Sequence, residues 1–181
     1  MLRLSRLARL SRTVNGVTDR HPADPIAEAR RQWSLRWPEQ ADHMAAVTSI
    51  MRAQQILLAK VEDVLKPYAL TFAAYEALRL LAFSRSGSLP MGKMGVRLMV
   101  HPAAVTNAIA RLEQRGLVQR QMSPDDRRVV LATITPAGRT LAEEATDALN
   151  QAAFGLPGLS QEQAAEVTAM LNLIRASTGD V

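Results

Sequence analysis

The chain has 181 residues, of which 48% are apolar and 22% are charged, and its formal net charge at pH 7 is +5. This length suits one domain, and the lack of cysteine excludes disulfides, thiolate metal sites and thiol redox sensors. No apolar run approaches the roughly 18 residues of a membrane span, so we expect a cytoplasmic protein without a membrane partner.

Positive charge is concentrated in one part of the chain. Residues 85–139 contain nine basic and three acidic residues, whereas residues 140–181 contain one basic and six acidic residues. Residues 23–84 are balanced, with seven of each sign. A basic segment of this kind indicates a polyanionic partner such as nucleic acid. The alternative is a solvated basic face that binds nothing.

The first 22 residues differ from the rest, because arginines at positions 3, 6, 9 and 12 are interleaved with leucines. They lack the continuous apolar centre of a secretory signal. We expect residues 1–22 to be a basic, disordered N-terminal extension. The alternatives are an amphipathic arm that binds phosphate or an anionic surface, and a translation start near Val17.

Two helices are expected between residues 24 and 66. Asp24 followed by Pro25 is a helix start, and the first helix should run to about Arg36. A longer helix over about residues 40–66 carries two apolar stripes. The first stripe is Met44, Val47, Met51, Leu58, Val61 and Leu65, and the second is Ile50, Leu57 and Val64. A helix with two apolar faces is expected in a core or between subunits.

The following segment predicts a helix, a loop and a helix-turn-helix. Thr71 caps a helix over residues 72–83, and residues 84–88 form a loop by composition. Pro90 opens a short helix, and a tight turn separates it from a helix over residues 102–115. Two helices joined in this way are typical of a DNA-reading module.

The helix over residues 102–115 is the expected recognition helix, with Gly116 as its left-handed stop. Val105, Ile109 and Leu112 form its buried stripe. The residues expected to face outward are Ala103, Ala104, Thr106, Asn107 and Arg111. Alanine and threonine methyl groups can contact thymine methyls, and asparagine can bond adenine, while Arg111 and Arg115 suit phosphate. The alternative is that Thr106 and Asn107 are only solvated helix residues.

A charged hairpin is expected next, with strands over residues 117–122 and 128–135. In its second strand, Val129, Leu131 and Thr133 alternate as expected for a strand with one buried face. Asp126 is spaced to bond Arg128 or the turn backbone, which leaves Arg127 and Arg128 projecting. A projecting arginine fits a narrow minor groove. A plain charged hairpin tip is the alternative.

Two helices are expected after the hairpin. The first follows Gly138 and ends near Ala153, and Ser160 with Gln163 forms a capping box that starts the last helix. We expect these helices and the N-terminal pair to bury their apolar faces against a second copy. Residues 23–181 are therefore expected to form one mainly α domain with a small β-hairpin wing. In it, a winged helix-turn-helix over about 67–139 is flanked by dimerisation helices over about 24–66 and 139–177.

The stretch from the recognition helix through the hairpin resembles the MarR (multiple antibiotic resistance regulator) family. The shared pattern is R-L-E at 111–113, G-L-V at 116–118, P-D-D-R-R at 124–128 and I-T-P-A-G at 134–138. The resemblance extends over about residues 24–177. It implies a homodimeric transcriptional regulator, which we expect to be a repressor, that binds a near-palindromic operator in double-stranded DNA. It also implies that a small aromatic or phenolic ligand alters DNA affinity.

A ligand cleft between the dimer arms and the reading head is expected to be lined by Trp33, His43, Met44, Tyr75 and Glu76. Ordinary core packing is the alternative for these side chains. The three histidines have no metal-like spacing, so no metal or cofactor is expected. No set of residues points to an enzyme. The alternative function is a nucleic-acid-binding or architectural module without sequence preference.

Overall fold

The computed structural model describes residues 24–98 and 102–179. The predicted N-terminal extension over residues 1–22 lies outside the described residues. The chain divides into two compact units, residues 1–52 and residues 53–181. Helix α2 (Ala41–Leu65) crosses the boundary between them.

The described part of the first unit begins with the expected helix start. Asp24 caps α1 (Pro25–Ser34), and its carboxylate accepts a hydrogen bond from the Ile26 amide at 3.0 Å. A short 3₁₀ turn, η2 (Pro38–Gln40), then leads into α2. The Arg30 guanidinium lies 2.6 Å from the Asp42 carboxylate and so joins α1 to the first turn of α2.

In the second unit, α2 ends in a 3₁₀ turn, η3 (Lys66–Tyr68), and Ala69 then takes up a left-handed backbone conformation with φ of 51°. The Thr71 side chain accepts a hydrogen bond from the Ala74 amide and caps α3 (Phe72–Phe83), as the sequence predicts. The helix-turn-helix consists of α4 (Met91–Leu98) and α5 (Pro102–Gln114). The chain continues through a hairpin to α6 (Pro136–Gln151), η4 (Ala153–Gly155) and α7 (Gln161–Ser177).

A small antiparallel sheet in the order β1-β3-β2 stands beside these helices. It is built from β1 (Ser88–Pro90), β2 (Val118–Met122) and β3 (Val130–Ile134). The sequence predicts only the two strands of the hairpin, and the expected loop in fact ends in β1. Ser88 pairs with Thr133, and their hydroxyl oxygens are 2.9 Å apart. The partner of β1 is distant in sequence, so local composition could not reveal this strand.

The buried face of β3 is the opposite of the predicted one. Ala132 and Ile134 are buried, whereas Val129, Leu131 and Thr133 are only half-buried. Apolar residues occupy both faces of this strand, so alternation alone does not determine which face is inward. Packing against the core selects the face with Ala132 and Ile134.

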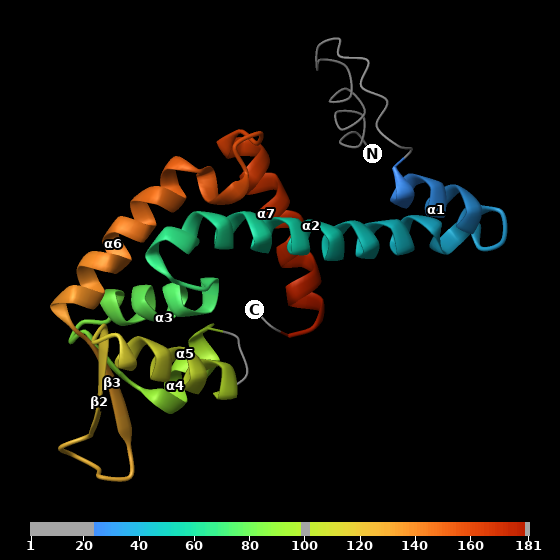
Figure 1. The fold of residues 1–181 in the computed structure, drawn as a ribbon. Helices are drawn as coiled ribbons and strands as arrows, with labels where there is room; N and C mark the ends of the chain where they lie inside the picture. The colour runs from blue at the N-terminus through green and yellow to red at the C-terminus, as the bar shows by residue number, and fades with distance from the viewer. Residues whose placement is uncertain (1–23, 99–101, 180–181) are drawn as a thin grey trace. The chain divides into compact units, whose positions relative to one another are not determined.

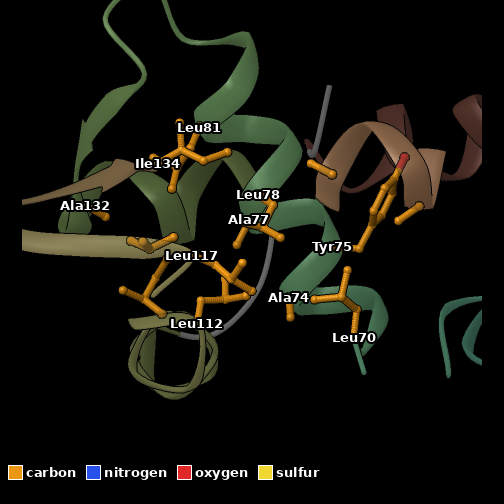
Figure 2. Close-up of a cluster of buried hydrophobic side chains, with 14 of the residues drawn as sticks. Leu70, Ala74, Tyr75, Ala77, Leu78, Leu81, Leu112, Leu117, Ala132 and Ile134 are labelled. Carbon is orange, nitrogen blue, oxygen red and sulfur yellow. The ribbon is translucent and has the colours of Figure 1, made fainter. Parts of the chain in front are cut away.

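One hydrophobic core holds the second unit together. Figure 2 shows Leu78 and Leu81 of α3 together with Leu112 of α5 and Ile134 of β3. The end of α2 contributes Leu65. Because all these elements bury residues in the same cluster, the end of α2, the recognition helix and the wing are packed as one body.

Helix α6 begins earlier than the sequence predicts, because Thr135 caps it and Pro136 is its first residue, ahead of Gly138. Helix α7 begins as predicted, since Ser160 and Gln163 form its reciprocal capping box. None of the helices in residues 24–98 and 102–179 combines the length and apolar composition needed to cross a membrane.

Candidate nucleic-acid interface

Helix α5 has the division into two faces that the sequence predicts. Val105, Ile109 and Leu112 are buried in the core cluster, because residues three and four apart lie on one side of a helix. The outward residues Ala103, Ala104, Thr106, Asn107 and Arg111 are all exposed. The predicted orientation of these residues is therefore correct.

The C-terminal end of α5 is tied to the chain that follows the wing. Gly116 has a φ of +69°, and its amide bonds to the Glu113 carbonyl at 2.9 Å, so the helix stops where the sequence predicts. The Thr135 hydroxyl donates to the Gly116 carbonyl at 2.8 Å, and the Thr135 amide donates to the Leu117 carbonyl at 3.0 Å. These bonds hold the end of α5 against the start of α6.

The wing tip has a defined shape. The Asp126 carboxylate accepts hydrogen bonds from the Arg128 amide at 2.9 Å and from Arg128 Nε at 3.2 Å. The hydrogen bond from the backbone amide has the larger effect, and together the two bonds lower the pKa of the Asp126 carboxyl. The Arg128 side chain is nevertheless 91% exposed, and Arg127 is exposed as well. The β2–β3 hairpin therefore carries both arginines to a tip that protrudes beyond α4 and α5 (Figure 1).

A second link joins the recognition helix to the wing. Glu113 of α5 accepts hydrogen bonds from Arg120 of β2, at 2.7 Å from Nε and at 3.2 Å from the backbone amide. The hydrogen bond from the Arg120 side chain lowers the pKa of Glu113. The sequence does not indicate this pairing, because it depends on the angle between α5 and β2.

Arg115 has a contact that the sequence did not suggest. Its two terminal nitrogens donate to the Ala69 carbonyl at 2.6 Å and to the Tyr68 carbonyl at 2.9 Å. Both acceptors lie at the end of η3, where the chain leaves α2. The residue expected to contact phosphate thus makes two hydrogen bonds inside the protein.

An open pocket of about 500 Å³ lies between the start of α3 and the outward face of α5. Ala104, Asn107 and Arg111 line it from α5, and Thr71 and Ala73 line it from the other side. Residues that the sequence predicts to contact DNA therefore share one concave surface with the start of α3.

Two of the five predicted ligand residues line another pocket, of about 440 Å³. Tyr75 and Glu76 share it with residues of α3, α4, α6 and η4, among them Phe72, Phe83, Thr146 and Phe154. The Tyr75 hydroxyl is 3.1 Å from the Thr146 hydroxyl. Burial raises the pKa of the Glu76 carboxyl.

The other three predicted ligand residues belong to the first unit. The ring of Trp33 packs at 4.8 Å against that of Trp37, His43 is exposed, and Met44 is half-buried. These three residues lie in the first unit, whereas Tyr75 and Glu76 lie in the second. Within the described ranges, no cluster of three or more His, Asp or Glu residues could hold a metal ion.

Comparison with known proteins gives consistent results. The model of the MarR family matches residues 70–130. The uncharacterized HTH-type transcriptional regulator YhbI of Bacillus subtilis is 39% identical over 85 residues, which are 47% of this chain and 54% of YhbI. The chain thus spans about half the length of this curated relative.

Two solved structures extend the similarity to most of the fold. Sco3205, a MarR family regulator from Streptomyces coelicolor in complex with DNA, is 25% identical, with a TM-score of 0.65 over 76% of this chain and 88% of Sco3205. Sco5413, a MarR family transcriptional regulator from the same organism, is 54% identical, with a TM-score of 0.71 over 77% of this chain and 96% of Sco5413. The chain therefore belongs to the MarR family of winged helix-turn-helix transcriptional regulators, which are not enzymes.

Proposed function

We propose that this protein is a transcriptional repressor that binds a near-palindromic operator as a homodimer. The carrying observation is that one packed unit combines the exposed face of α5 with a wing tip at which Arg127 and Arg128 project. A regulator needs both, because the helix reads base edges while the wing grips a flank. A dimer bound over a promoter would block access to it, which would repress transcription.

The proposed contacts follow from the chemistry of each exposed side chain. Thr106 and Asn107 contact base edges, and Ala103 and Ala104 contact thymine methyl groups. Arg111 binds phosphate, which adds affinity without sequence information. At the wing, Asp126 orients Arg128, and Arg127 and Arg128 enter the minor groove.

Exposed apolar side chains on two helices support a homodimer. Those on α2 are Val47, Ile50, Met51, Ile56 and Leu58, and those on α7 are Val167, Met170, Leu171, Leu173 and Ile174. Long apolar faces of this kind are rarely left in water, and a second copy with the same faces can cover them symmetrically. In this proposal residues 24–66 and 139–177 dimerise, and residues 67–139 read DNA.

We also infer that a small aromatic molecule releases the repressor. The pocket at Tyr75 and Glu76 supports this, because aromatic side chains and a few polar groups line it. Trp33, His43 and Met44 of the first unit are proposed to contact the ligand as well. Ligand binding need only favour a dimer whose recognition helices no longer match half-sites about 34 Å apart.

The DNA-binding proposal is tested by selecting duplexes from a random library with the purified full chain. Fluorescence anisotropy then compares the tightest selected duplex with random duplex at several salt concentrations. We expect the selected duplex to bind at least about 10³-fold more tightly. Equal affinity for both would instead favour the architectural module without sequence preference.

The assembly proposal is tested by sedimentation velocity. The chain has a mass of 19.8 kDa, so a dimer of about twice that mass is expected. Leu173→Glu should yield monomers, because it places a charge on the apolar face of α7. Val96→Glu is the matched control, because Val96 is an exposed apolar residue of α4 outside the proposed interface. A wild-type monomer at micromolar concentration would refute the homodimer.

The ligand proposal is tested with salicylate, benzoate and phenol as probes. A ligand that binds the folded state raises the melting temperature and should weaken binding to the selected duplex. Replacing Phe154 with Ala removes an aromatic side chain from the rim of the pocket and should reduce both effects. If none of the probes changes either quantity, the proposed aromatic effector is refuted for this class of small phenols and benzoates.

A further inference from the structure

Arg115 joins the end of the recognition helix to the end of α2. Its guanidinium bonds to the carbonyls of Tyr68 and Ala69, which lie 47 and 46 residues earlier in the chain. A guanidinium can hold two acceptors at once because its N–H groups form a rigid fork. These two hydrogen bonds thus connect two elements that are distant in sequence.

The position of the acceptors explains why a cation binds there. Carbonyl groups at the end of a helix are left without partners in the following turn, and the helix dipole makes this end negative. Here α2 continues into η3, and Ala69 then turns the chain with a left-handed backbone. A positive side chain that bonds to the last carbonyls is stabilising at such a site.

The opposite end of the contact is equally well placed. Arg115 directly follows α5 and precedes the stop at Gly116, whose carbonyl is held by Thr135. A displacement of Arg115 therefore also displaces the C-terminal end of the recognition helix. Because α2 leads directly into η3, a change in the direction of α2 reaches α5 through this contact as well as through the core.

We propose that Arg115 is a positioning residue, which sets the angle of the recognition helix relative to α2 and does not bind a phosphate. The proposal rests on the proposed function, since it concerns how α5 is presented to DNA. Arg115 contributes to sequence-specific affinity by holding α5 in one orientation, and makes no phosphate contact of the kind that all duplexes share.

Arg111, in the last turn of α5, provides a matched comparison. It lies four residues before Arg115, carries the same charge, and is exposed on the same open pocket. Arg111 is proposed to bind phosphate, whereas Arg115 bonds to carbonyls of the protein. The same substitution at the two positions should therefore affect DNA binding in different ways.

The experiment measures the affinity of Arg115→Met, Arg115→Lys and Arg111→Met for the tightest selected duplex and for random duplex, over a range of salt concentrations. Loss of a phosphate contact in each subunit of a dimer should reduce the slope of log affinity against log salt by about 1.8. We expect this reduction for Arg111→Met. For Arg115→Met we expect an unchanged slope and a loss of about tenfold in the ratio of selected to random affinity.

Arg115→Lys separates the two roles most sharply. Lysine keeps the charge but cannot donate as a fork to two carbonyls. If Arg115 is a positioning residue, this variant loses most of the same affinity ratio as Arg115→Met. If lysine retains wild-type affinity and Arg115→Met loses about 1.8 in slope, Arg115 binds phosphate and the proposal is overturned.

Hydrogen exchange tests the contact without DNA. Amides near residues 66–70 and 112–118 should exchange faster in Arg115→Lys and Arg115→Met than in the wild type, and those regions should be unaffected in Arg111→Met. Unchanged exchange in the Arg115 variants would overturn the proposal even if the wild type binds DNA as proposed. If the wild type shows no sequence preference while the exchange changes appear, the proposed function fails and the structural link remains.

Discussion

Gly138 gives the sharpest test of how the start of α6 packs against the segment that links α5 to β2. A Cβ atom at this position would lie 2.1 Å from the Leu117 carbonyl oxygen, whereas ordinary contacts begin at about 3.4 Å. The first turn of α6 would therefore have to move by about 1 Å, away from the segment where α5 ends. Overpacking of this kind costs about 1–3 kcal/mol, and disturbing the 3.0 Å hydrogen bond from Thr135 to Leu117 adds about 1 kcal/mol.

We therefore expect Gly138→Ala to lower the free energy of unfolding by about 2–4 kcal/mol, measured by urea denaturation. Gly92→Ala is the matched control, because Gly92 lies in α4 with no atom near its added Cβ. There alanine should be neutral or stabilise by up to about 1 kcal/mol. Equal stability of Gly138→Ala and the wild type would show that α6 can be displaced without cost and would refute the reasoning.

Further predictions concern charge and base recognition. Arg128→Ala should weaken binding to selected and random duplexes alike, whereas Asn107→Ala should reduce only the preference for the selected duplex; anisotropy with both duplexes checks this, and identical effects of the two variants would contradict it. The pKa of Glu113 is lowered by Arg120, so this pair stabilises the fold above the ordinary glutamate pKa of about 4.3 and loses that contribution as pH falls through the lowered pKa. Glu113→Gln should therefore lower the urea midpoint at pH 7, and the difference from the wild type should shrink as pH falls below the ordinary glutamate pKa. A difference that is independent of pH would argue against the ion pair as its cause. Burial raises the pKa of Glu76, so the contribution of this group to stability is fully present below the ordinary glutamate pKa and is lost as pH rises through the raised value. Glu76→Gln should be more stable than the wild type at pH 7, with the difference vanishing on acidification; a less stable variant at pH 7 would mean that the ionised carboxylate has a stabilising partner.

Local signals in the sequence were sufficient for the presence of the helices and for three of their caps. Asp24, Thr71 and Ser160 each cap the helix that they were expected to start, because a cap depends on residues within three positions of it. The outward face of α5 was equally predictable, since its apolar residues follow a single helical period. Family membership was also predictable, because the shared motif lies in one continuous stretch.

The features that could not be predicted depend on which elements meet. β1 exists only because it pairs with β3, and the inward face of β3 is chosen by the core and not by its alternating pattern. The link from Glu113 to Arg120 depends on the angle between a helix and a strand. In each case the contact depends on how two separate elements pack, which the periodicity within one element does not determine.

The order of the helices and of the two hairpin strands, the reading face of α5 and the arginines of the wing tip were all predictable, because they follow from helical period, turn chemistry and charge. What each of the neighbouring arginines does depends instead on the fold. Arg111 and Arg115 look alike in sequence and both are exposed, yet the fold brings the Tyr68 and Ala69 carbonyls within hydrogen-bonding distance of Arg115. The physical reason is that a side chain's role is set by the acceptors within its reach, and for Arg115 those acceptors come from the distant end of α2.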